Sequence, residues 1–115
     1  MAEWKSYAES RDENAEIAAS ASETFFGGAV DSQKRTKDGS YNELEIINNS
    51  DIPVEFALDG LSDRKRKLFG KATVTIEAKD NIYFDTVKIT NTSSTTAIDA
   101  ADVTAIARIL KKVGA

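Results

Sequence analysis

The chain has 115 residues, a net charge of −4 and an apolar content of 41%. That length is typical of one domain with one modest core. It contains no cysteine and no histidine, which excludes disulfides, thiolate metal sites, a cysteine nucleophile and histidine-based acid–base catalysis. We therefore expect a protein that is not an enzyme, with no catalytic residue, no metal site and no cofactor.

No stretch of the sequence approaches the roughly 18 apolar residues that a membrane-spanning helix needs. The first twenty residues also lack the apolar run of a secretory signal peptide. These two observations predict a chain that stays in a cytoplasm, or is assembled into a larger particle from there, without contacting a membrane.

Residues 1–30 are rich in alanine, glutamate and serine, and they contain no proline. Alanine and glutamate favour helix, so we expect an N-terminal helical arm. Two basic and seven acidic side chains give residues 1–31 a net charge of −5, which accounts for the acidity of the whole chain. The apolar stripe is too weak for a stable isolated helix. The arm's aromatic side chains either complete the core or, in our preferred interpretation, anchor a partner: Trp4, Tyr7, Phe25 and Phe26.

Residues 31–40 are polar and turn-rich, which predicts a linker. A β domain is expected over residues 41–115. Apolar and polar residues alternate there in four segments, as in half-buried strands: 42–48, 52–60, 72–79 and 82–90. The alternation slips at Phe84–Asp85, which indicates a β-bulge.

Residues 99–113 carry the signals of an amphipathic C-terminal helix. Asp99 suits the N-cap, and apolar residues recur at helical spacing from Val103 to Val113. The predicted fold class is therefore α+β, mainly β. It combines a small antiparallel sheet or sandwich with an N-terminal helical arm and a C-terminal helix that closes the β domain.

The segment "LSDRKRKLFGK", residues 61–71, concentrates positive charge in an acidic chain. It lies between two predicted strands, so we expect a loop, with Phe69 turned into the core. The loop is either simply solvated or a contact for an acidic partner. An acidic protein surface is favoured over nucleic acid, because nucleic-acid-binding domains are usually basic overall. The basic side chains of this candidate contact are Arg64, Lys65, Arg66, Lys67 and Lys71.

The stretches "LEIINNSDIPVEFALDG" and "ATVTIEAKDNIYFDTVKIT" together resemble the small β domains of tailed-phage virion proteins. In those domains a strand, a polar turn and a strand ending in "DG" precede a hairpin. The resemblance covers about half of the chain. It implies a structural virion subunit, either a capsid decoration protein or a head–tail or tail component, present in symmetric copies and assembled in the host cytoplasm.

The leading hypothesis is a non-enzymatic assembly protein. Its arm and basic loop would contact other copies of itself and other virion proteins, with the acidic arm of one copy meeting the basic loop of a neighbour. A second hypothesis is a β-sandwich binding module that recognises a glycan or a protein surface through loop aromatics, for which the candidates are Tyr41, Phe69 and Tyr83. The third and less favoured hypothesis is an accessory protein that contacts nucleic acid through residues 64–71.

Overall fold

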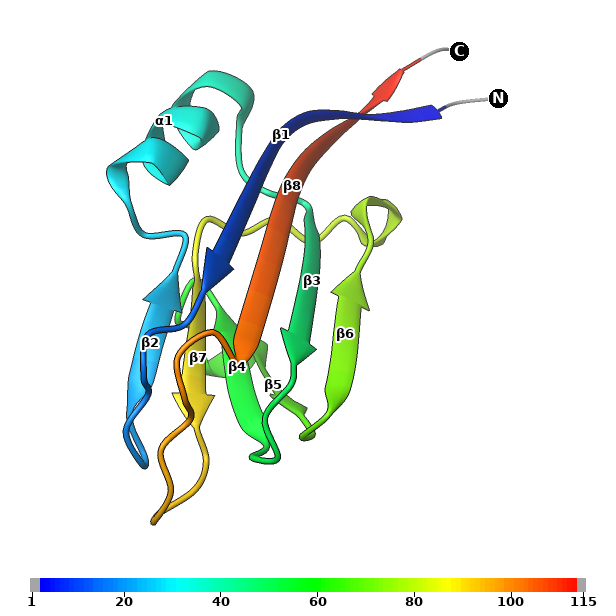
Figure 1. Ribbon diagram of the computed structural model, residues 1–115. Coiled ribbons are helices and arrows are strands. Elements are labelled where there is room, and N and C mark those ends of the chain that lie inside the picture. Colours follow the sequence, from blue (N-terminus) through cyan, green and yellow to red (C-terminus); the bar gives the residue numbers. More distant parts are fainter. Residues whose placement is uncertain (1–2, 114–115) are drawn as a thin grey trace.

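The computed structural model of the chain, which describes residues 3–113, is a sandwich of two antiparallel β-sheets with one α-helix (Figure 1). The prediction of a mainly β fold is confirmed. The elements in chain order are β1 (Glu3–Glu13), β2 (Ser22–Phe25), α1 (Ala29–Asp38), β3 (Glu43–Asn48), β4 (Val54–Leu58), the 3-10 turn η1 (Ser62–Arg64), β5 (Lys65–Leu68), β6 (Ala72–Ile76), the 3-10 turn η2 (Ala78–Asp80), β7 (Val87–Asn91) and β8 (Val103–Val113).

The strands form two four-stranded sheets. The front sheet has the order β1-β8-β3-β6 and the back sheet the order β2-β7-β4-β5. Every pair of neighbours is antiparallel, and the chain crosses between the sheets several times. This strand order is that of an eight-stranded jelly roll.

The four strands expected from alternation are present as β3, β4, β6 and β7. In β3, Leu44 and Ile46 face the core, and in β7, Val87 and Ile89 do so. The expected bulge at Phe84–Asp85 is replaced by another arrangement. Phe84 forms an isolated bridge with Tyr41, and β7 begins only at Val87.

The predicted N-terminal helix is wrong, because residues 3–13 form strand β1 along the edge of the front sheet. The inward side chains of β1 include Ala8 and Ser10, which are too small or polar to produce an apolar alternation. Pairing with β8 overrides the local helix propensity of this segment. The expected linker at 31–40 is mostly helix α1.

The predicted C-terminal helix is also wrong, because residues 103–113 form β8 between β1 and β3. The residues at odd positions from Val103 to Ile109 pack in the core. Ile106 lies on the opposite face and is still only 7% exposed. A strand with apolar residues on both faces resembles a buried helix in sequence, so periodicity alone could not separate the two.

Aromatic rings fill one end of the core. The Tyr41 ring centroid lies 5.5 Å from that of Phe26 and 5.7 Å from that of Phe84. Tyr41 is fully buried, yet its hydroxyl lies 2.7 Å from the Ser10 hydroxyl on β1. The Arg35 guanidinium of α1 lies 5.6 Å from the Tyr41 ring. Tyr41 therefore joins the helix, β1 and the core.

Buried asparagines hold the connections between strands. The Asn91 side-chain amide donates to the Ile17 and Thr96 carbonyls, and its oxygen accepts from the Ser93 amide. Asn42 both donates to and accepts from the backbone of Leu110. These side chains satisfy backbone groups that no strand pairs, which a buried loop requires.

We predict that Tyr41→Phe lowers the free energy of unfolding by about 1 kcal/mol, because the buried Ser10 hydroxyl loses its 2.7 Å hydrogen bond with Tyr41 and keeps the longer one, 3.3 Å, from the Lys34 ammonium. The matched control is Tyr83→Phe, at a side chain that is 54% exposed, where we expect almost no change. Urea unfolding of the three proteins measures both effects. Equal stability of Tyr41→Phe and the unaltered protein would contradict the structural role of the hydroxyl.

We also predict that the stability difference between the unaltered protein and Tyr41→Phe narrows above about pH 10. Burial raises the pKa of Tyr41 above its ordinary value. The contribution of the neutral phenol is fully present below the unfolded-state pKa and is lost as the pH rises through the folded-state pKa. Urea unfolding at about pH 8 and about pH 11 tests this, and a gap that widens at high pH would contradict it.

Candidate interaction surface

The two ends of the described chain form a two-stranded ribbon that projects past the sandwich (Figure 1). We call residues 3–7 of β1 and 110–113 of β8 the terminal ribbon. The pairing of β3 with β8 stops at Glu43 opposite Arg108. The Asn42 side chain is hydrogen-bonded to the backbone of Leu110. Beyond Leu110, and within residues 3–113, the only strand that neighbours β8 is β1. The ribbon therefore has two free strand edges.

The terminal ribbon carries exposed aromatic side chains. Trp4 is 41% and Tyr7 is 43% exposed. A register shift between Ser6 and Ala8 makes Tyr7 an extra residue in β1. The ammonium groups of Lys5 and Lys111 lie 5.6 Å and 4.8 Å from the centre of the Tyr7 ring. An isolated pair of strands is marginally stable in water, so the ribbon is a surface that a partner would stabilise.

The other two predicted anchors are not on this surface. Phe25 is 0% and Phe26 is 1% exposed, and both belong to the core. They sit where β2 ends, packed in a T-shaped arrangement with ring centroids 6.3 Å apart. The aromatic residues of the arm are thus divided, with Phe25 and Phe26 completing the fold and Trp4 and Tyr7 exposed.

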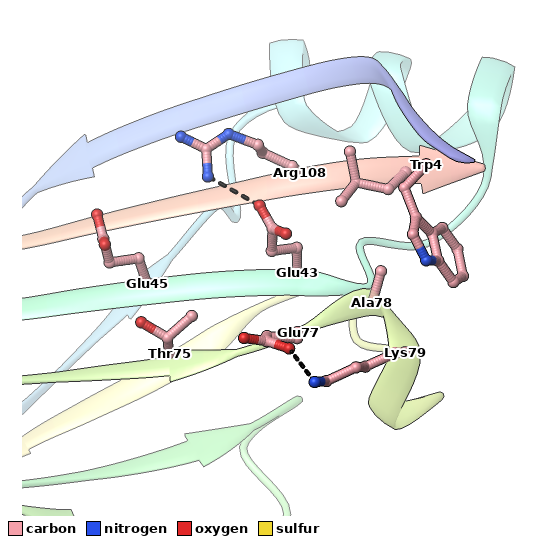
Figure 2. Close-up of a pocket in the computed structure, with 9 residues that line it drawn as sticks. Trp4, Glu43, Glu45, Thr75, Glu77, Ala78, Lys79 and Arg108 are labelled. Carbon is pink, nitrogen blue, oxygen red and sulfur yellow. Dashed lines mark hydrogen bonds and ion pairs between the residues drawn. The ribbon is translucent and has the colours of Figure 1, made fainter. Parts of the chain in front are cut away.

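The outward side of the front sheet is acidic. Arg108 of β8 lies between two glutamates, with Nε 2.8 Å from Glu9 of β1 and Nη1 2.9 Å from Glu43 of β3. Figure 2 shows its pair with Glu43. These hydrogen bonds raise the pKa of Arg108 above its ordinary value. Glu45 and Glu77 lie beside them, around an open cavity of about 260 Å³ that Trp4 also lines.

We call this outward side the acidic face. The charged residues of this face lie on β1, β3 and β8, with one more directly after β6: Glu9, Arg11, Glu13, Glu43, Glu45, Arg108 and Glu77. Five glutamates against two arginines leave a net charge of −3. Counting Lys79, whose ammonium lies 3.0 Å from Glu77, leaves −2. Glu77 also raises the pKa of Lys79 by accepting a hydrogen bond from it.

The basic segment is structured, in contrast to the predicted loop. It forms η1 and then β5, an edge strand of the back sheet. Arg64 has a structural role, since its guanidinium lies 2.9 Å from Asp59 and donates to the Tyr83 carbonyl. Lys71 donates to the Asn49 carbonyl. Within residues 3–113, Arg66 and Lys67 have no ion-pair partner within 4.0 Å.

Phe69 does not enter the core, contrary to the prediction, and it is 65% exposed. Leu68 occupies the core position at the end of β5. The next residue in an extended chain points away from it. The Lys67 ammonium lies 5.9 Å from the Phe69 ring, so this aromatic belongs to the charged surface.

The outward side of the back sheet is basic, and we call it the basic face. Lys65 and Lys67 of β5 point outward with Glu55 of β4 and Lys88 of β7, which gives a net charge of +2. Lys65 lies 3.7 Å from Glu55. From the sequence, Lys88 was not identified as part of a basic surface, although Lys88 lies between the inward residues Val87 and Ile89. That alternation was the signal that could have found it.

The aromatics of the binding-module hypothesis do not converge. Tyr41 is buried, while Phe69 and Tyr83 are exposed. The β5–β6 connection that holds Phe69 and the segment between η2 and β7 that holds Tyr83 lie at opposite ends of the sandwich (Figure 1). These three residues therefore do not form one aromatic platform.

The part of the chain that the structure describes holds no group of three or more acidic residues placed to bind a metal ion. Over the same residues, no helix has the length and apolar character needed to cross a membrane. Comparison of the chain with protein-family models, with curated proteins and with solved structures found no match.

We predict that Arg108→Gln lowers the free energy of unfolding by about 1 kcal/mol, because Glu9 and Glu43 then face each other across β8 without the charge between them. Added salt should reduce the difference by screening that repulsion. The control is Arg11→Gln, whose pair with Glu13 is long at 3.9 Å and exposed, where the change should stay within about 0.5 kcal/mol. Equal effects of the two substitutions in urea unfolding would contradict the role of Arg108.

Proposed function

We propose that this chain is a non-enzymatic structural subunit of a tailed-phage virion, as a capsid decoration protein or a head–tail or tail component. Its copies would contact one another through the N-terminal strand and the basic segment. The observation that carries the proposal is the terminal ribbon, whose two strands extend beyond the sandwich (Figure 1) and whose β1 strand exposes Trp4 and Tyr7.

The ribbon has the features of an assembly contact. Exposed aromatic side chains are the residues that most often dominate the binding free energy of interfaces. Free strand edges allow a partner to add main-chain hydrogen bonds. Projection beyond the body makes these groups accessible to a neighbouring subunit without a rearrangement of the sandwich.

The charge of the ribbon indicates which partner suits it. Lys5, Lys111 and Lys112 against Glu3 give it a net charge of +2. Two such ribbons placed edge to edge would bring like charges together, which disfavours symmetric pairing. An acidic protein surface is therefore the better partner for the ribbon.

The virion part of the proposal is supported by the strand pattern and by the topology. The stretches at 44–60 and 72–90 resemble small virion β domains, and they form strands β3, β4, β6 and β7. Jelly rolls are also used by viral capsid proteins. Because one fold serves many functions, this support is by analogy, and assembly itself is what an experiment must test.

We predict that the protein self-associates and that the double substitution Trp4→Ser with Tyr7→Ser weakens self-association at least tenfold, since it removes two aromatic anchors. Sedimentation velocity over a concentration series measures this. The matched control is Phe69→Ser, which removes an exposed aromatic from the β5–β6 connection, at the end of the sandwich away from the ribbon (Figure 1), and should change association little. Thermal unfolding confirms that each variant is folded.

Two results would overturn the proposal. One is an unaltered protein that stays monomeric up to about 1 mM. The other is that the ribbon variant, Trp4→Ser with Tyr7→Ser, is folded and associates as tightly as both the unaltered protein and the control variant.

A further inference from the structure

We propose, building on the assembly function above, that the acidic face of one copy binds the basic face of the next copy. The association is then heterologous: each copy uses one side of its sandwich for the neighbour before it and the other side for the neighbour after it. The occupant of each face is a second copy of this chain.

The two faces are on opposite sides of the same sandwich. Each sheet turns one side to the shared core and the other side outward. β1, which carries much of the N-terminal acidity, is an edge strand of the front sheet. β5, which carries the basic run, is an edge strand of the back sheet, and β2 is the edge strand at the other side of that sheet. These opposite charges cannot neutralise each other within one chain, whereas two copies can bring them together.

Several charges on the two faces lack partners inside the chain. Among residues 3–113, Glu45 on the acidic face has no ion pair within 4.0 Å. Lys67 and Lys88 on the basic face have none either. Their side chains rise from sheets whose other outward residues are mostly short, including Thr75, Thr104, Ser22, Ala57 and Thr90. Each face has an open hollow, of about 260 Å³ on the acidic face and about 280 Å³ on the basic face, and the opposite signs of their charges make the two faces complementary.

The charges also decide which pairs of faces can form. Two acidic faces would bring net charges of −3 together, and two basic faces would bring +2 against +2. Like-charge contacts of this kind are unfavourable, so symmetric association through either face is opposed. Only the acidic-to-basic pairing is attractive, and a heterologous contact produces either a ring or an extended array.

Nucleic acid fits the basic face less well than a second copy does. The face holds only three lysines, and Glu55 lies among them, 3.7 Å from Lys65. The chain as a whole has a net charge of −4, so a phosphate backbone that extends past the face would be repelled.

The proposal is tested with two charge-reversed variants. One is Glu13→Lys with Glu45→Lys, which changes the acidic face to a net charge of +1. The other is Lys67→Glu with Lys88→Glu, which changes the basic face to −2. All four positions lie outside the ribbon, and none takes part in the Arg108 pairs. The protein with all four substitutions keeps the original net charge of −4, which controls for the overall charge of the chain.

We expect each double variant alone to associate at least tenfold more weakly than the unaltered protein in sedimentation velocity. An equimolar mixture of the two should regain association, because each supplies the face that the other lacks. The fourfold variant should regain it as well, and about 0.5 M salt should weaken every charge-dependent contact.

The outcomes separate this inference from the proposed function. If the unaltered protein associates but the mixture is no more associated than its components, the contact between faces is wrong and ribbon-based assembly stands. The same follows if the double variants associate as tightly as the unaltered protein. A monomeric unaltered protein overturns both proposals.

Discussion

The pairing of the first strand with the last is the constraint on which the rest of the structure depends. β1 covers the edge of β8 along its whole length, from Glu3 opposite Val113 to Glu13 opposite Thr104. This pairing closes the front sheet over the core and creates the terminal ribbon. It also brings the acidic N-terminal segment to the outward side of that sheet. Without it, β8 would lie at an open edge and Tyr41 would lose its partner on β1.

Polar groups hold β1 in place where apolar side chains cannot. The inward side of the strand presents Ser10 to the Tyr41 hydroxyl, and its outward side presents Glu9 to Arg108. A strand of this composition gains little from the hydrophobic effect. The register of β1 against β8 therefore relies on specific hydrogen bonds. The same reliance on polar contacts explains why buried asparagines recur at the strand connections.

The sequence predicts those elements whose apolar residues alternate over one buried side, which are β3, β4, β6 and β7. It does not predict β1 and β8, for opposite reasons. β1 has almost no apolar alternation, while β8 is apolar on both faces and matches a helical stripe equally well. In both, long-range pairing decides the conformation. At the candidate surface, the sequence groups Trp4 and Tyr7 with Phe25 and Phe26, and it cannot separate the exposed pair from the buried pair. The two ion pairs of Arg108 depend on strand neighbours that no local pattern specifies.

The basic run in an acidic chain has a physical explanation once it is placed on β5. Lysines on an edge strand oppose unwanted pairing with the edge of another sheet, and Lys65 and Lys67 stand on such an edge. In the proposed assembly, copies meet through the outward faces and the terminal ribbon, and not through the edge of β5. The charge that prevents disordered edge-to-edge aggregation is then the same charge that makes the basic face complementary to the acidic one. Solubility of the free subunit and specificity of its assembly would in that way depend on the same side chains.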